Sequence, residues 1–229
     1  MPRPEWIEYE IACYHLIDRG RDQGRFKIFR SPEYFEAFLH TLKEAVERFG
    51  IVVHGYWLMT NQYHLLIQTP HANLSRAMRH VNGGYTQRHN QLTKSDGPIF
   101  RGRFKSILVE RDAYLLQMSR YIHLQPMEGK KPLIDNLADY SWSSFPAYIN
   151  QTDKPEWLMC EQIYGKLGSM RKYSAYARYL AQGNNEQLTR FYNRGNTALV
   201  IGEKEFVRWL SEKKITTPQR KQNSEFNHP

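Results

Sequence analysis

The sequence predicts an α+β protein with a ferredoxin-like antiparallel sheet, helices on one face of it, and a helical C-terminal extension. The main observation is the order of periodic segments over residues 11–125, which is strand, helix, hairpin, helix, strand, helix. A four-stranded antiparallel sheet with two helices on one face satisfies this order. After about residue 150 the signal changes to short helical segments with little strand character.

The first strand is expected over residues 11–17, and the basic, glycine-rich segment 18–27 is interpreted as a loop. That loop is either a solvated connection or a phosphate-contacting segment. The Ser-Pro-Glu sequence at residues 31–33 predicts a helix start, because serine can cap and proline is tolerated in the first turn. Apolar residues then recur at helical spacing, and Gly50 ends this helix.

The next two strands form a predicted hairpin over residues 51–59 and 63–68. Asn73 can cap a second helix, in which Gly83 and Gly84 indicate either close packing or a bend.

A fourth strand is expected over residues 104–110. Asp112 can cap a third helix that runs to Gln125, where Pro126 disfavours further helix. We expect this third helix to be an addition docked on the ferredoxin-like core.

The chain divides into three predicted regions. Residues 1–150 form the core domain, residues 151–210 a helical extension, and residues 211–229 a polar, basic tail that we expect to be disordered. Helices of the extension are expected over residues 157–164, 170–180, 186–192 and 203–210.

Composition limits the functional classes. The 229 residues carry a net charge of +9 and a pI near 9.5, a balance that favours polyanionic partners such as nucleic acids. No apolar run reaches the roughly 18 residues of a membrane helix, and the N-terminus lacks an apolar signal core, so we expect a cytoplasmic protein. The two distant cysteines, Cys13 and Cys160, exclude a thiolate zinc site and make a disulfide framework an unfavoured interpretation.

Two short segments carry the candidate chemistry. Gln62 and His64 are two residues apart in a predicted strand, so their side chains share one face of the sheet. Tyr121 and Gln125 are four residues apart in a predicted helix and share one helix face. A tyrosine beside a divalent metal can attack a phosphodiester. Each of these residues taken alone is typical of a structural role, and one His with one Gln is a weaker metal signal than two His.

In its motifs the chain resembles the REP-associated tyrosine transposases of the single-tyrosine HUH endonuclease superfamily, the IS200-like transposases. The resemblance covers roughly residues 5–150 and is looser beyond them. The segments that carry it are YHLIDRG (14–20), YWLMTNQYHLL (56–66), NLSRAM (73–78), FRGRFKSILV (100–109), YIHLQP (121–126) and WSSF (142–145). The later segment LVIGEKEFV (199–207) also resembles the longer members.

The resemblance implies an HUH endonuclease core that binds Mg²⁺ or Mn²⁺ and cleaves single-stranded or hairpin DNA through a 5′-phosphotyrosine bond. Tyr121 matches the family nucleophile, His64 the second His of the metal motif, and Gln125 the third-ligand position. Gln62 stands where the family normally has His, which weakens the expected metal site. The resemblance also implies a bacterial protein that acts on nucleoid DNA, and it leaves the choice between monomer and homodimer open.

Basic side chains are candidates for contacts with the DNA backbone, with ordinary surface charges as the alternative. They are Arg19, Arg21, Arg76, Arg79, Arg88, Arg101, Arg103 and Lys105. His15, His54 and His123 are expected to have packing or hydrogen-bonding roles.

Three functional hypotheses remain. The first is an active single-strand endonuclease and strand transferase that acts on palindromic repeats. The second is a domesticated DNA-binding protein of the same fold, in which Gln62 weakens or abolishes catalysis. The third is an RNA-binding module of the RRM type, which shares the sheet topology. The sequence lacks the aromatic RNP motifs of that module.

Overall fold

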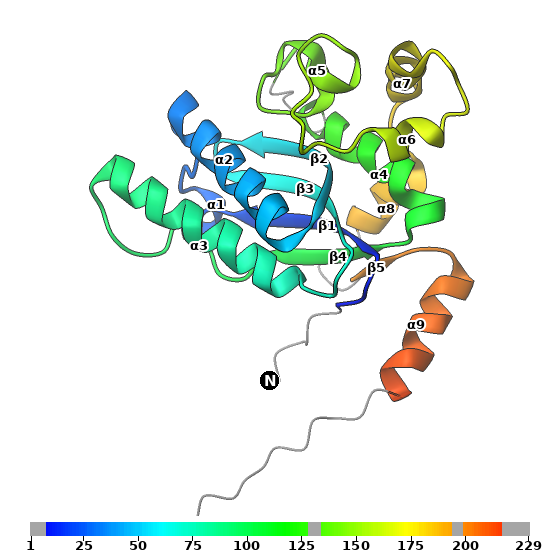
Figure 1. Ribbon diagram of the computed structural model, residues 1–229, viewed down its shortest axis with the longest axis horizontal. Coiled ribbons are helices and arrows are strands. Elements are labelled where there is room, and N and C mark those ends of the chain that lie inside the picture. Colours follow the sequence, from blue (N-terminus) through cyan, green and yellow to red (C-terminus); the bar gives the residue numbers. More distant parts are fainter. Residues whose placement is uncertain (1–7, 128–133, 194–198, 217–229) are drawn as a thin grey trace, which may run out of the picture.

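The computed structural model describes residues 8–127, 134–193 and 199–216, and its centre is a mixed five-stranded sheet (Figure 1). The strands are β1 (Ala12–Arg19), β2 (Val52–Met59), β3 (Gln62–Thr69), β4 (Lys105–Val109) and β5 (Val200–Ile201), in the order β2-β3-β1-β4-β5. The first four strands pair antiparallel in the ferredoxin-like order, which confirms the predicted fold class. Strand β5 adds to the edge, parallel to β4.

Helices α2 (Pro32–Phe49) and α3 (Leu74–Thr93) pack together on one face of the sheet. As predicted, α2 ends at Gly50, which has the left-handed φ of 64° that glycine adopts without strain. A Cβ built on Gly84 would lie 3.2 Å from Cγ2 of Thr41. Gly84 therefore serves close packing between the two helices, one of the two roles expected for the glycine pair, whereas a Cβ on Gly83 would meet no atom within 4 Å among the described residues.

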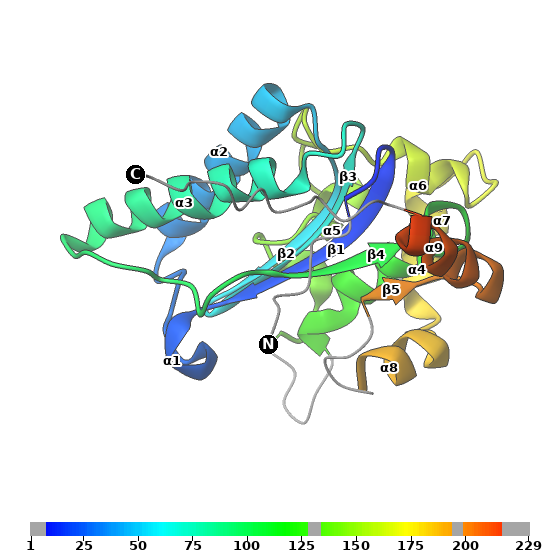
Figure 2. The ribbon, with the colours of Figure 1, turned by 90° about the horizontal axis from the view of Figure 1, so that it is seen from below.

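The opposite face of the sheet is covered by α4 (Arg111–Leu124), the added third helix, as Figure 2 shows. The C-terminal region follows on this side of the molecule. Its helices are α5 (Phe145–Tyr148), α6 (Glu161–Gly165), α7 (Lys172–Ala181) and α8 (Glu186–Asn193), and α9 (Lys204–Thr216) follows β5. Because both faces are covered, β1 and β3 are buried along almost their whole length.

Two short segments of the first half of the chain differ from prediction. The segment expected to be a loop over residues 18–27 begins inside β1, because Arg19 still pairs with Gln62 of β3, and it contains the single turn α1 (Arg21–Gly24). The N-cap of α4 is Glu110, and Asp112 lies in the first turn of the helix. Helix α4 then passes into the 3₁₀ turn η1 (Gln125–Met127). A second 3₁₀ turn, η2 (Leu137–Asp139), follows later in the chain.

The start of the extension differs from prediction because it pairs with a distant part of the chain. The segment before α6 was expected to be helical from residue 157. Instead Leu158 bridges to Val53 on the edge of β2, and Met159 donates its N–H to the Val53 carbonyl at 2.8 Å. Strand β5 is too short to produce a periodic signal. Helix α9 runs to Thr216, so the first residues of the predicted tail are helical, while residues 217–229 lie outside the described part.

None of the helices over residues 8–127, 134–193 and 199–216 combines the length and the apolar character that a membrane span requires.

Candidate functional site

The metal-motif residues lie at the start of β3, on the sheet face that α4 covers. Gln62 pairs with Arg19 of β1 and Met59 of β2, and its Nε2 donates to the Met59 sulfur at 2.9 Å. His64 pairs with Trp57 two residues further along the strand and is only 3 % exposed. The alternation of the strand therefore places both side chains on the predicted common face.

Tyr121 faces the same region from the last turn of α4. Its side chain is 6 % exposed, and its ring stacks in parallel on Tyr192 of α8 with centroids 4.2 Å apart and planes inclined by 10°. The edge of His15 from β1 lies against it at 6.0 Å. Gln125, half-buried, keeps right-handed helical backbone angles at the end of α4, so the four-residue spacing from Tyr121 remains helical.

His15 connects the two halves of the site. Its ring stacks on His64 with centroids 5.2 Å apart, and its Nε2 lies 3.0 Å from Nδ1 of His64. Its other ring nitrogen, Nδ1, is hydrogen-bonded to the hydroxyl of Tyr192. Tyr121 and His64 thus both contact one buried imidazole.

Burial keeps both imidazoles neutral. Desolvation, together with the charge of Arg19, lowers the pKa of His64 to about 3. Desolvation, followed by the neighbouring His64 and Lys105, holds the pKa of His15 well below its ordinary value. Neutral imidazole is the form that binds metals, because the coordinating nitrogen needs a free lone pair.

Nε2 of His64 is a buried atom that could bind a metal ion. Nε2 of His64 has no hydrogen-bond partner among the described residues, although buried polar atoms are normally satisfied. Within that part of the chain, no group of three or more His, Cys, Asp or Glu side chains could hold a metal ion. A set made of His64 with the amide oxygens of Gln62 and Gln125 is one nitrogen and two oxygen donors. Such a set suits Mg²⁺ or Mn²⁺ better than it suits zinc.

The basic candidates fall into two groups, so the structure does not bring all of them together. Arg19, Arg21 and Arg101 gather near Gln62, where Gly20 bridges to Phe100 and the Arg101 N–H donates to the Arg19 carbonyl at 2.9 Å. The Arg21 guanidinium lies 4.5 Å from the centre of the Phe26 ring. Exposed Arg103 precedes β4, and Lys105 is its first residue, paired with Ile17.

The second basic group lies on α3. Arg76 and Arg79 are exposed on this helix, which covers the sheet face opposite α4. Arg88 is held by Glu44 through two nitrogens at 2.7 and 3.1 Å, and it also donates to Thr41. Arg88 is therefore a structural side chain that joins α2 and α3.

Sequence reasoning missed two members of the site. The expected packing or hydrogen-bonding role of His15 is confirmed by its two hydrogen bonds, but the residue was not placed in the site, although its alternation on β1 indicates that it faces the same way as the motif on β3. Tyr192 lies about 70 residues after Tyr121 in the chain. Nothing in its local sequence indicates that α8 returns to the sheet.

The comparisons with known proteins concern the family and the fold of the chain. The model of the transposase IS200-like family matches residues 12–125. A solved structure of a REP-associated tyrosine transposase bound to a REP hairpin has the same fold, with a TM-score of 0.57 and 12 % identity, over 69 % of this chain and 92 % of that one. A proposed transposase from Deinococcus radiodurans R1 is 18 % identical over 55 % of this chain and 98 % of that one, but its TM-score of 0.37 supports no argument. No curated protein matches the chain.

Proposed function

Residues 12–125 belong to the transposase IS200-like family, and from this premise we propose that the protein is a metal-dependent single-strand DNA endonuclease and strand transferase that acts on hairpin DNA of palindromic repeats. The observation that carries the proposal is the contact of Tyr121 with His15, whose Nε2 is hydrogen-bonded to His64. The candidate nucleophile and the candidate metal ligand are therefore parts of one buried cluster.

The proposed chemistry is an in-line displacement at phosphorus. The phenolic oxygen of Tyr121 forms the new P–O bond while the P–O3′ bond of the DNA breaks. The phenolic proton leaves the tyrosine, and the departing O3′ gains a proton, so the products are a 5′-phosphotyrosine and a free 3′-hydroxyl. Attack of a 3′-hydroxyl on the phosphotyrosine reverses these bond changes and joins the strands, which requires no nucleotide cofactor.

The proposed metal is Mg²⁺ or Mn²⁺, held by His64, Gln62 and Gln125. Nε2 of His64 supports this assignment, because it is buried and lacks a partner among the described residues. When bound, the ion would polarise the scissile phosphate and stabilise the charge that develops in the transition state. The protein side chains position Tyr121 and exclude water from it.

The proposed substrate is single-stranded DNA beside a short hairpin, which would place the activity with chromosomal DNA in a bacterial cytoplasm. The net charge of +9 supports a polyanionic partner. The group of arginines at the end of β1 lies next to Gln62, so a backbone bound there would run past the site. The similar transposase was solved with a REP hairpin, which suggests the same class of ligand for this chain.

A second function is favoured by the residue type at position 62. The amide oxygen that Gln62 can offer is a weaker metal ligand than an imidazole. A protein that keeps the fold and binds hairpin DNA without cleaving it is therefore the alternative.

A covalent-adduct assay separates these two functions. Labelled single-stranded oligonucleotides that fold into hairpins with short flanks are mixed with the protein, with and without Mn²⁺, and run on a denaturing gel. We expect a metal-dependent adduct that disappears in Tyr121→Phe. Tyr85→Phe, which changes a buried tyrosine of α3 on the opposite face of the sheet, is the control and should keep the adduct. Tight hairpin binding without any adduct would instead support the binding-only function.

A further inference from the structure

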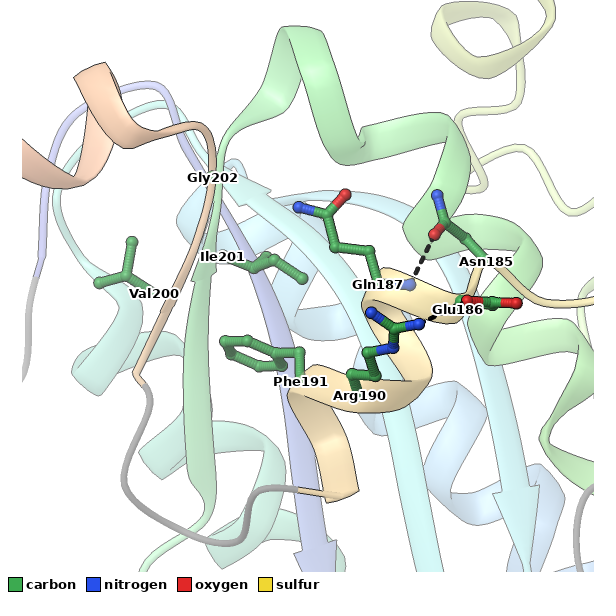
Figure 3. A pocket seen from close by; sticks show the side chains of 8 residues that line it. All are labelled: Asn185, Glu186, Gln187, Arg190, Phe191, Val200, Ile201 and Gly202. Atoms are coloured by element: carbon green, nitrogen blue, oxygen red, sulfur yellow. Dashed lines mark hydrogen bonds and ion pairs between the residues drawn. The ribbon is translucent and has the colours of Figure 1, made fainter.

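Helix α8 is fixed to α4 by side-chain contacts that bring its last turn to the site. Asn185 donates to the Gln117 side-chain oxygen at 2.8 Å, and Gln187 donates to the Tyr114 hydroxyl at 2.7 Å. Leu188 is fully buried. Figure 3 shows a hollow between α8 and β5, which Arg190 and Phe191 line together with Asn185 and Gln187. The helix is thus held between α4 and the sheet edge.

Tyr192, near the end of α8, makes three separate contacts in this position. Its ring stacks on Tyr121 at 4.2 Å, and its hydroxyl is hydrogen-bonded to Nδ1 of His15. The same hydroxyl lies 3.5 Å from the sulfur of Met118, three residues before Tyr121 on α4. One side chain of the extension therefore contacts the candidate nucleophile and the imidazole next to His64.

These contacts favour one direction for the hydrogen bonds. A thioether sulfur only accepts, so the Tyr192 O–H donates in the contact with Met118, and its oxygen is then left to accept from the Nδ1–H of His15. The neutral His15 ring then has a bare Nε2, which accepts from the Nδ1–H of His64. His64 is then left with a bare Nε2, an atom that has no hydrogen-bond partner among the described residues. If these hydrogen bonds ran in the opposite direction, Nε2 of His64 would carry a proton and would be a buried donor with no acceptor among the described residues. Buried N–H groups without an acceptor are rare.

We propose that Tyr192 and His15 form a hydrogen-bond relay that holds His64 in its Nδ1–H tautomer and keeps the Nε2 lone pair available to a metal ion. The role of the metal rests on the proposed function, whereas the tautomer is a property of the chain itself. Second-shell hydrogen bonds of this kind orient a metal-binding histidine and set its basicity. Tyr192 is then a positioning residue, and the C-terminal extension completes the site formed by residues 12–125.

Histidine ¹⁵N NMR of the full chain without metal or DNA tests the tautomer directly. We expect the His64 signals of the wild type to show protonated Nδ1 and bare Nε2. Tyr192→Phe keeps the stacked ring but removes the acceptor for the Nδ1–H of His15. Both proton arrangements then leave one buried N–H without an acceptor, so His64 should change from a single Nδ1–H form to a mixture of the Nδ1–H and Nε2–H forms. Tyr176→Phe is the matched control, because it removes a buried hydroxyl bonded at 2.7 Å to Nδ1 of another histidine, His123. It should leave His64 unchanged.

Mn²⁺ titration followed by electron paramagnetic resonance measures the consequence. Tyr192→Phe should weaken Mn²⁺ binding about 10- to 100-fold, the usual effect of a lost second-shell partner. Tyr176→Phe should stay within about twofold of the wild type, on the same scale. In a His15→Leu background, Tyr192→Phe should have no further effect, because the relay is already interrupted.

Two results would overturn the proposal. One is a wild-type His64 that carries its proton on Nε2, and the other is a Tyr192→Phe variant whose His64 tautomer equals that of Tyr176→Phe. Neither result depends on DNA cleavage. A protein that forms no DNA adduct but shows the expected tautomers would refute the proposed function and keep the relay.

Discussion

Asp18 offers a stability test that is independent of the candidate site. This carboxyl on β1 is only 4 % exposed and lies on the sheet face opposite His15. It accepts hydrogen bonds from the Asn82 amide and from the Arg19 N–H, both at 2.8 Å. Desolvation outweighs these two bonds and raises the pKa of Asp18 to about 7, from 3.8.

The sign of the effect follows from proton binding. Between about pH 4 and pH 7 the folded state keeps the Asp18 proton that the unfolded chain has already lost. The free energy of unfolding therefore decreases as the pH rises through this window. The full shift of about three units corresponds to at most about 4 kcal/mol, of which about 2 to 3 kcal/mol falls between pH 5 and pH 8.

Asp18→Asn removes this titration while it keeps the size of the side chain. Urea unfolding of both proteins at pH 5 and pH 8 measures the effect. Relative to the wild type, the variant should gain about 2 to 3 kcal/mol of unfolding free energy between these two pH values. A stability difference that is the same at both values would refute the raised pKa, whatever the size of that difference.

Two further predictions concern the metal and the DNA. Gln62→His should tighten Mn²⁺ binding roughly tenfold, because an imidazole replaces an amide. Gln87→His, on the exposed surface of α3, is the control. If Mn²⁺ titration gave the same affinity for Gln62→His as for Gln87→His, Gln62 would not be a ligand. For single-stranded DNA, the double variant Arg19→Gln/Arg101→Gln should reduce the slope of log K against log salt by about 1.4, at about 0.7 per phosphate contact. Arg88→Gln should leave that slope unchanged because Glu44 already holds Arg88, and an unchanged slope in the double variant would remove the β1 arginines from the DNA footprint.

The core of the fold was predictable because its signals are local. Alternation in the hairpin and helical spacing before Gly50 each follow from neighbouring residues, and the order of elements then leaves few sheet topologies. The segment around Leu158 was not predictable in this way. Its conformation is set by pairing with Val53, more than 100 residues earlier in the chain, and no local pattern reports such pairing.

The residues of the candidate site also differ in whether a local sequence pattern indicates them. Gln62, His64, Tyr121 and Gln125 were proposed from the sequence because two of them share a strand face, two share a helix face, and the surrounding motifs resemble the family. What joins the two pairs is His15.

The environment of that histidine could not be read from the sequence. Its role depends on a hydroxyl from α8, and the position of α8 depends on contacts such as Gln187 with Tyr114. The extension has weak periodic signals because its helices are short, yet Tyr192 reaches the centre of the site. A motif can therefore identify the side chains that would meet a metal, whereas the proton positions on those side chains depend on residues outside the motif. For this reason the His64 tautomer in Tyr192→Phe is the more discriminating measurement, since the motif alone predicts no change in it.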